Sequence, residues 1–551
     1  MTAPEPAPAP THSPAHAPAP APAPSRRGFL RLAAGGAGAV ALGGLAGCGT
    51  DRPSTGVLLA SDPEVELPRP FTLPLTVPAV AEPAHGTRGT HGTDVYEVTQ
   101  RRASVEILPG TRTEIWSYDG TFPGPTFRAR SGRPVRLRMT NTLPTPTATH
   151  LHGGVTPPGS DGYPTDLLHP AGHHEDSAHP MRGMADTHGG TMHGGDSATG
   201  TRTYTYPLRQ RAATLWYHDH RMDFSGPQVW RGLAGFFLVD DDEEDALPLP
   251  KGDRDIPLLL CDRSFDADGA FRYPSLDPTL TRTPGVRSGY MDGVLGDVQL
   301  VNGRPWPYLE VSAARYRLRL LNAANARRYR LALITSDGRR LPFVQIGSDQ
   351  GLLARPQTLD TLTMAPAERY DVVLDLSACA PDTTVTLVNT LAEGAMRDVM
   401  RFHVTSRARG RDDSRIPTRL SRTETLRAEQ AVLTRHFDFR LGSDDMWTVN
   451  GHPFDPARTW ATPRLGTVER WRLTSDFHHP VHLHLAHFQV LSRAGGPPDA
   501  GDRGWKDTVD LRPYEVVEIL ARFDGYRGRY MLHCHNLEHE DMAMMANFRV
   551  V

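Results

Sequence analysis

The sequence is short of several features that would indicate other protein classes. Lys and Arg number 60 against 63 Asp and Glu, so there is no basic excess of the kind that nucleic-acid binding requires. Mean hydropathy is −0.42, which argues against a protein with several membrane-spanning helices. Long stretches of helical periodicity are scarce, whereas glycine (51) and proline (49) are frequent. The composition of the 551 residues favours a loop-rich, β-rich enzyme of several domains over a helical bundle.

Cysteine is also rare, with four residues, whereas histidine is abundant, with 25. Eight of the histidines form four His-x-His motifs, at 150–152, 218–220, 482–484 and 533–535. Side chains i and i+2 of an extended strand point to the same face, about 6.6 Å apart along the chain. Each motif therefore presents two imidazoles side by side. A single such pair would be an ordinary polar strand face, but eight imidazoles can hold a cluster of several metal ions.

The motif at 533–535 places Cys534 between two histidines. The two imidazoles face one way and the thiolate the other, so the thiolate can bind one metal while its neighbours bind others. His479 and His539 complete a Cys/two-His set, and Met544 can add a weak axial thioether. This combination indicates blue copper, whereas zinc would normally take four firm ligands. The alternation also gives a short covalent path between two metal centres.

One pattern, a turn signal followed by a strand of alternating apolar and polar residues, occurs three times. The copies span 122–141, 301–322 and 449–474. They predict three related β-sandwich domains over 94–245, 253–407 and 426–551. The second copy carries no histidine motif, so a site built from all four motifs would have to lie between the first and third domains.

The N-terminal residues lack this pattern. Residues 1–47 contain Arg26-Arg27 before a mild apolar run and resemble a twin-arginine export signal, and the run ends in a sequence that resembles a lipobox at Cys48. We expect export, a lipid anchor at Cys48 on the outer face of the cell membrane, and a disordered tether over 48–93. The alternative is a short membrane anchor.

The four histidine motifs resemble the ligand motifs of multicopper oxidases, in detail those of spore-coat-type bacterial laccases and bilirubin oxidases. The resemblance covers roughly residues 94–551 and includes Ala-Pro-Ala-Glu-Arg-Tyr-Asp at 365–371 and Gly-Trp-Lys-Asp-Thr at 504–508. It implies an all-β protein of three cupredoxin-like Greek-key β-sandwich domains that binds four copper ions.

Position by position, the resemblance assigns ligands to three kinds of copper. The type 1 copper takes His479, Cys534, His539 and Met544, the type 2 copper takes His150 and His482, and the type 3 pair takes His152, His218, His220, His484, His533 and His535. Asp219 stands in the first domain where Cys534 stands in the third, so the first domain resembles a cupredoxin without type 1 copper.

The implied reaction is laccase-like. Small aromatic reductants give up single electrons at the type 1 copper, the electrons pass through Cys534, and dioxygen is reduced to water at the other three coppers. Asp161 and Glu540 match the family's proton-supplying acids, although an Asp-Gly turn and a solvated loop acid are the plainer interpretations. The alternatives are a cuprous or other metallo-oxidase in copper resistance, a phenoxazinone-synthase-like aminophenol oxidase, and a non-enzymatic copper carrier.

Two features depart from the resemblance or stay open. The loop 169–195 is rich in His and Met and is either an insertion without consequence or a segment that collects copper or cuprous ion. Cys261 and Cys379 both lie in the second domain, where they either form a disulfide or remain buried thiols.

Overall fold

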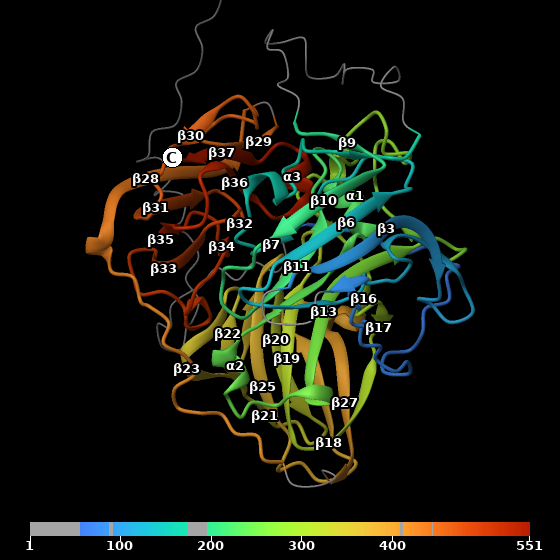
Figure 1. Cartoon of the computed structure of the whole chain (residues 1–551). Helices are drawn as coiled ribbons and strands as arrows, with labels where there is room; N and C mark the ends of the chain where they lie inside the picture. Colours follow the sequence, from blue (N-terminus) through green and yellow to red (C-terminus); the bar gives the residue numbers. More distant parts are fainter. Residues whose placement is uncertain (1–55, 87–91, 173–194, 408–411, 444) are drawn as a thin grey trace, which may run out of the picture. The chain divides into compact units, whose positions relative to one another are not determined.

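The computed structural model describes residues 56–86, 92–172, 195–407, 412–443 and 445–551, which are almost entirely β-structured (Figure 1). The α-helices in these residues are short: α1 spans Ser225–Trp230, α2 Asp242–Asp245 and α3 Leu537–Asp541. In this part of the chain no helix has the length and apolar character needed to cross a membrane. The prediction of an all-β fold is confirmed.

One sheet arrangement recurs three times. In the first copy the strand order is β4 (Thr113–Tyr118), β3 (Asp94–Val105), β6 (Val135–Asn141) and β10 (Thr201–Tyr206). In the second copy it is β16 (Val298–Val301), β13 (Asp255–Phe265), β19 (Arg315–Asn322) and β25 (Arg369–Asp375). In the third copy it is β29 (Trp447–Val449), β28 (Ala431–Leu441), β31 (Thr467–Ser475) and β35 (Val516–Phe523). In each set the middle pair is parallel and the outer pairs are antiparallel. Further strands extend these sheets: β2 (His85–Gly86); β14 (Phe271–Arg272), β17 (Arg304–Pro305), β22 (Phe343–Ser348) and β23 (Gly351–Leu359); and β33 (His487–Arg493).

A second arrangement also recurs three times. In the first copy the strand order is β7 (Thr149–His152), β11 (Ala213–Asp219), β12 (Ala234–Asp240) and β5 (Phe127–Arg130). In the second copy it is β20 (Tyr329–Thr335), β26 (Thr384–Asn389), β27 (Asp398–Arg407) and β18 (Tyr308–Ala313). In the third copy it is β32 (His479–Leu483), β36 (Gly528–Cys534), β37 (Met545–Val550) and β30 (Thr459–Ala461). Three more strands join these sheets: β21 (Arg340–Leu341), β24 (Leu362–Met364) and β34 (Thr508–Leu511). Each pair of sheets forms one sandwich, and we call these the first, second and third domains.

Strand periodicity explains how each sandwich forms its core. In β6, Val135, Leu137 and Met139 are buried while Arg136 and Arg138 are exposed. The strands β19 and β31 occupy the same place in the other two domains and contribute apolar side chains to their cores. These are the alternating strands of the threefold sequence repeat, so the prediction of three related β-sandwiches is confirmed.

The predicted tether over 48–93 is wrong for residues 56–86. Strand β1 (Val57–Leu58) pairs in parallel with β15 (Val294–Leu295), and the Ser61 hydroxyl donates to Asp297 Oδ1 over 2.5 Å. Leu59 is 2% exposed. The Pro- and Gly-rich composition of this segment does not predict its packing. An extended segment can form backbone hydrogen bonds even when its sequence has no periodic pattern of apolar residues.

Several predictions fall on residues outside the described ones. These are the export signal, Cys48, and residues 173–194 of the His- and Met-rich loop. The structure does describe Cys261 and Cys379, which are both buried and free. The second domain therefore has two separate thiols and no disulfide between them.

Helix α3 of the third domain contacts both other domains. Asp541 accepts hydrogen bonds from the backbone N–H groups of Ser225 (2.7 Å) and Gly226 (2.8 Å) in the first domain. Glu538 accepts from the Tyr273 hydroxyl (2.7 Å) and Asn325 Nδ2 (2.8 Å) in the second. Helix α3, which follows β36, therefore joins the third domain to both of the others.

Candidate metal centre

The four histidine motifs lie on equivalent strands of the first and third domains. Strands β7 and β11 pair with His218 opposite His150, and β32 and β36 pair with His533 opposite His482. The equivalent strands of the second domain, β20 and β26, carry no histidine. The same two strands thus supply imidazoles in two domains, as the sequence predicts.

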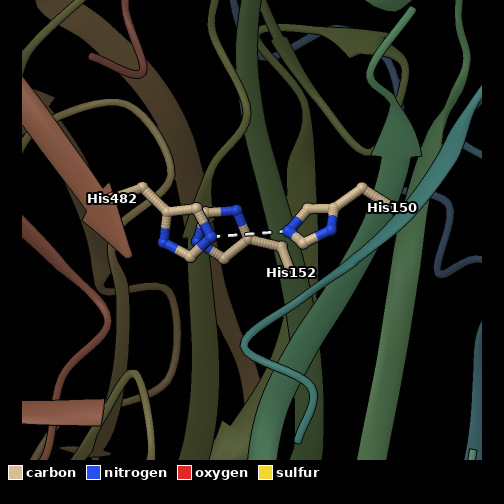
Figure 2. Close-up of side chains that lie close together, drawn as sticks. All are labelled: His150, His152 and His482. Atoms are coloured by element: carbon tan, nitrogen blue, oxygen red, sulfur yellow. Dashed lines mark hydrogen bonds between the residues drawn. The ribbon is translucent and has the colours of Figure 1, made fainter. Parts of the chain in front are cut away.

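The structure brings all eight motif histidines together at the boundary between these domains. They form three groups in which the candidate ligand atoms lie within 4.8 Å of one another: His150 with His152 and His482, His152 with His218 and His535, and His220 with His484 and His533. Each group combines residues of both domains. All eight side chains are at most 1% exposed. Figure 2 shows the first group, with the dashed line joining His150 and His482.

The spacing of the ring nitrogens fits metal coordination. His150 Nε2 lies 3.4 Å from His482 Nε2, and His220 Nε2 lies 3.2 Å from His484 Nε2 and 3.3 Å from His533 Nε2. Ligand nitrogens at about 2.0 Å from a shared metal ion stand about 3.3 to 3.5 Å apart. Within their two groups, these five imidazoles therefore already have the mutual distances of ligands to one ion.

Unpartnered nitrogens give an independent indication. Neither ring nitrogen of His535 has a hydrogen-bond partner among the described residues, nor does Nε2 of His218 or Nδ1 of His152. Burial lowers the pKa of all three imidazoles well below the ordinary value. Neutral imidazoles with buried, unused lone pairs are costly without a ligand, and metal ions bind this form of histidine.

A second centre surrounds Cys534. Its Sγ lies 3.4 Å from His479 Nδ1 and 3.5 Å from His539 Nδ1, and these two nitrogens are 3.1 Å apart. Met544 is fully buried beside them, and its backbone N–H donates to the His539 carbonyl over 3.0 Å. Burial raises the pKa of the Cys534 thiol, so a thiolate here needs a cation to stabilise it. Trp447 covers the ring of His539 with centroids 3.9 Å apart.

The first domain has a carboxyl group where the third has this thiol. Asp219 ends β11 as Cys534 ends β36, and it is fully buried. Its carboxylate accepts from the backbone N–H groups of Ala148 (2.9 Å) and Arg221 (3.1 Å). Burial raises its pKa to about 7. Asp219 thus bonds to backbone groups of its own domain.

Both candidate acids contact the histidine groups. Asp161 Oδ2 lies 2.8 Å from His484 Nδ1, and the Asp161 carbonyl accepts from His150 Nδ1 over 2.7 Å. Glu540 places Oε1 3.1 Å from His220 Nδ1 and Oε2 3.2 Å from His533 Nδ1. Burial raises the pKa of Glu540. Glu540 is 1% exposed and is therefore not a solvated loop acid. Asp161 is 2% exposed and precedes Gly162, whose φ is +78°.

Sequence reasoning missed a further acid, Asp507. Its Oδ1 lies 2.9 Å from His152 Nε2, and its carbonyl accepts from His482 Nδ1 over 2.9 Å. Asp507 belongs to the 504–508 motif, which carried no role of its own in the sequence. The four remaining histidines of the third domain, His436, His452, His478 and His487, join none of the metal-ligating groups found among the described residues.

The chain is similar to known proteins over most of its length. Two family models, both described as multicopper oxidase, match residues 427–551 and residues 99–177 with 168–244. A laccase of Bacillus stratosphericus is 35% identical over 544 residues, which cover 87% of this chain and 99% of that protein. The chain belongs to the multicopper oxidase family.

Two further similarities cover most of the oxidase. A bilirubin oxidase of Albifimbria verrucaria is 34% identical over 524 residues, covering 90% of this chain and 84% of that protein. A crystal structure of a laccase from Pediococcus acidilactici has a TM-score of 0.74 and 29% identity, covering 88% of this chain and 95% of that one. The protein is therefore an oxidoreductase that binds copper and couples oxidation of a reducing substrate to reduction of dioxygen.

Proposed function

We propose that this oxidase is of the laccase type and oxidises small phenolic and other aromatic reductants, one electron at a time, with four-electron reduction of dioxygen to water. The observation that carries the proposal is the presence of both centres, the three imidazole groups and the Cys534 set, joined through residues 533–535. The relatives named laccase and bilirubin oxidase support it. A copper carrier would need only the Cys534 set.

Four copper ions fit the side chains that the fold brings together. One type 1 copper would be held by His479, Cys534, His539 and Met544, one type 2 copper by His150 and His482, and the type 3 pair by the triads His152, His218, His535 and His220, His484, His533. When bound, the coppers supply one-electron exchange at the thiolate set and dioxygen reduction at the imidazole groups.

The chain itself contributes the electron path and the handling of protons. Cys534 lies between His533 and His535, so only a few covalent bonds separate the thiolate from two imidazoles of different triads. Asp161 Oδ2 lies 2.8 Å from Nδ1 of His484, and the Glu540 carboxyl oxygens lie 3.1 and 3.2 Å from Nδ1 of His220 and His533, so both acids would supply protons beside this triad. Every group named is buried, which limits its contact with bulk water.

Small reductants would approach the Cys534 set from the side of Asp476. Its side chain is 31% exposed, and Oδ1 lies 3.5 Å from His479 Nε2. His539 is fully buried, and its Nε2 donates to the carbonyl of Asp292 over 3.2 Å, so a loop of the second domain covers this ring. Asp476 Oδ1 has no hydrogen-bond partner among the described residues and would accept a hydrogen bond from a phenolic hydroxyl.

A cuprous oxidase serving copper resistance is the second candidate. The observation that favours it is the density of His and Met in the loop 169–195, because both side chains bind cuprous ion. We further propose domain boundaries at 94–245, 253–407 and 426–551, export by the twin-arginine-type signal, and lipid anchoring at Cys48 on the outer face of the cell membrane.

Oxygen consumption with a methoxyphenol, bilirubin, an aminophenol and cuprous ion, compared side by side, tests the proposal. A laccase-type enzyme turns over the phenol, and deletion of residues 172–195 leaves that rate unchanged. Selective loss of cuprous oxidation in the deletion variant would favour the second candidate. Copper-loaded protein that consumes no oxygen with any of the four reductants would refute both.

A further inference from the structure

Asp507 contacts two imidazoles of the first metal-ligating group, His152 and His482, and His152 also belongs to the second group. Its carboxylate contacts Nε2 of His152 and its backbone carbonyl accepts from Nδ1 of His482, both over 2.9 Å. The opposite nitrogens face the groups, since His152 Nδ1 has no partner among the described residues and His482 Nε2 faces His150. Asp507 Oδ1 also lies 3.5 Å from His482 Nδ1, and the Thr508 hydroxyl contacts His152 Nε2 and His482 Nδ1 at 3.1 and 3.3 Å. Asp507 and Thr508 together therefore orient these two ligand rings.

The second domain holds Asp507 in place. Arg369, the first residue of β25, donates from Nη1 to Oδ1 over 2.6 Å and from Nη2 to Oδ2 over 2.5 Å. Gln350 of the same domain donates to Oδ2. A bidentate guanidinium–carboxylate pair is stronger than a neutral hydrogen bond and fixes the plane of the carboxylate. Arg369 and Asp507 are both 0% exposed, so water cannot replace either partner.

Arg369 is itself fixed by all three domains. Its Nε donates to the Thr214 carbonyl of the first domain over 2.9 Å, and Nη2 donates to the Asp349 carbonyl of the second over 3.0 Å. The glycine that follows His152 packs against the same cluster. A Cβ atom on Gly153 would lie 2.7 Å from Arg369 Nη2 and 2.8 Å from Asp507 Oδ2, and the φ of Gly153 is +85°.

We propose that Arg369 is a positioning residue of the copper centre, acting through Asp507 on His152 and His482. The second domain has no histidine motif, and in this view it contributes the anchor that orients imidazoles supplied by the other two. The inference deepens the proposed function and rests on it for the identity of the ligands. Loss of a group that orients a metal ligand typically weakens metal affinity by about 10- to 100-fold.

A purely structural role predicts a different result, and Arg317 provides the matched control. Arg317 also lies in the second domain and is 2% exposed. Its Nε donates to both carboxylate oxygens of Asp371 over 2.9 and 3.0 Å, and Nη1 donates to Glu244 over 2.8 Å. Among the described residues, no hydrogen bond joins Asp371 or Glu244 to a grouped histidine. Arg317→Lys and Arg369→Lys thus weaken two equivalent buried arginine–aspartate ion pairs. Of these two, only the pair of Arg369 and Asp507 contacts histidines of the metal-ligating groups.

The test compares the copper-loaded wild type with both lysine variants by copper content, by the EPR spectrum of type 2 copper, by the blue absorbance and by thermal unfolding. We expect Arg369→Lys to bind type 2 copper roughly tenfold more weakly, with a changed EPR signal and retained blue absorbance. Arg317→Lys should lower the unfolding temperature with normal copper content. Wild-type copper content and EPR in Arg369→Lys, or equal copper loss in both variants, would overturn the inference.

Gln350→Leu provides a second test that leaves no buried charge unpaired. It removes one donor to Asp507, so a smaller EPR change in the same direction supports the inference and an unchanged spectrum contradicts it. Failure of the proposed function is separable, because a wild type that binds copper but reduces no dioxygen leaves these copper and EPR comparisons valid.

Discussion

Replacing Glu540 with glutamine tests how the chain delivers protons for dioxygen reduction. Each carboxylate oxygen faces a ring nitrogen, at 3.1 Å for His220 and 3.2 Å for His533. Glutamine keeps the volume, but one acceptor becomes an NH2 group facing a ring N–H. The side chain also loses the ability to give up or take a proton.

The expected magnitude follows from the loss of the acid. A positioned acid or base contributes about 100-fold or more in rate. We therefore expect reoxidation of the reduced enzyme by dioxygen to slow by at least about 100-fold. The blue absorbance should persist, because Glu540 makes no hydrogen bond or ion pair with Cys534, His479 or His539 among the described residues.

Stopped-flow recovery of the blue absorbance after mixing reduced enzyme with dioxygen measures this step. Glu538→Gln is the matched control, because Glu538 lies on the same helix and is equally buried but bonds to Tyr273 and Asn325. Its reoxidation should stay near the wild-type rate. Equal slowing in the two variants, or loss of the blue colour in Glu540→Gln, would refute the reasoning.

The pH dependence gives the same test a second readout. Burial raises the pKa of Glu540, so this carboxyl keeps its proton to a higher pH than an ordinary glutamic acid. Proton donation is then available below the raised pKa and is lost as the pH rises through it. The wild-type reoxidation rate should therefore fall as the pH rises through the pKa of Glu540. The glutamine variant should not show this fall. An identical pH profile in both enzymes would contradict the role of Glu540.

Four further outcomes are expected. Asp161→Asn should slow reoxidation with the blue colour retained, because Asp161 contacts His484 and not the Cys534 set; bleaching would contradict this. Cys534→Ser should abolish the blue absorbance and oxidation of phenols while the imidazole groups still bind copper, measured as metal content. Leu59→Ala should cost about 3 kcal/mol in denaturant unfolding, since Leu59 is 2% exposed; a surface tether would show no effect. Burial raises the pKa of Glu244, but Arg317 and Arg319 outweigh it and lower that pKa to about 2. Glu244 should therefore contribute about 3 kcal/mol above pH 5, lost as the pH falls to about 2, a slope that Glu244→Gln should reduce.

Residue periodicity predicted the strands and the ligand inventory. The alternation of Val135, Leu137 and Met139 has the period of a half-buried strand, and the same period makes each His-x-His a pair of neighbouring imidazoles. Both facts are local, because side chains alternate along any extended strand. The same argument places Cys534 on the opposite face from His533 and His535 without reference to any tertiary contact.

The prediction of a disordered tether is wrong for residues 56–86 because the packing of this segment is not local. Leu59 and Ser61 lie in a segment without periodicity, and their burial depends on β15 and Asp297, more than 230 residues away in the chain. The two undecided cysteines were a similar case. Whether Cys261 and Cys379 meet depends on how strands of the second domain pack, and they remain separate thiols.

The sequence by itself determined that the chain folds into three related β-sandwiches and which side chains are able to bind copper, because strand geometry repeats every two residues. Only the tertiary structure decided which histidines share a group, since His150 and His482 meet across 332 residues at a domain boundary. It also decided that Arg369, from the domain without histidine motifs, reaches Asp507. Contacts of this kind arise from how domains pack on one another, and no local pattern of residues encodes that packing.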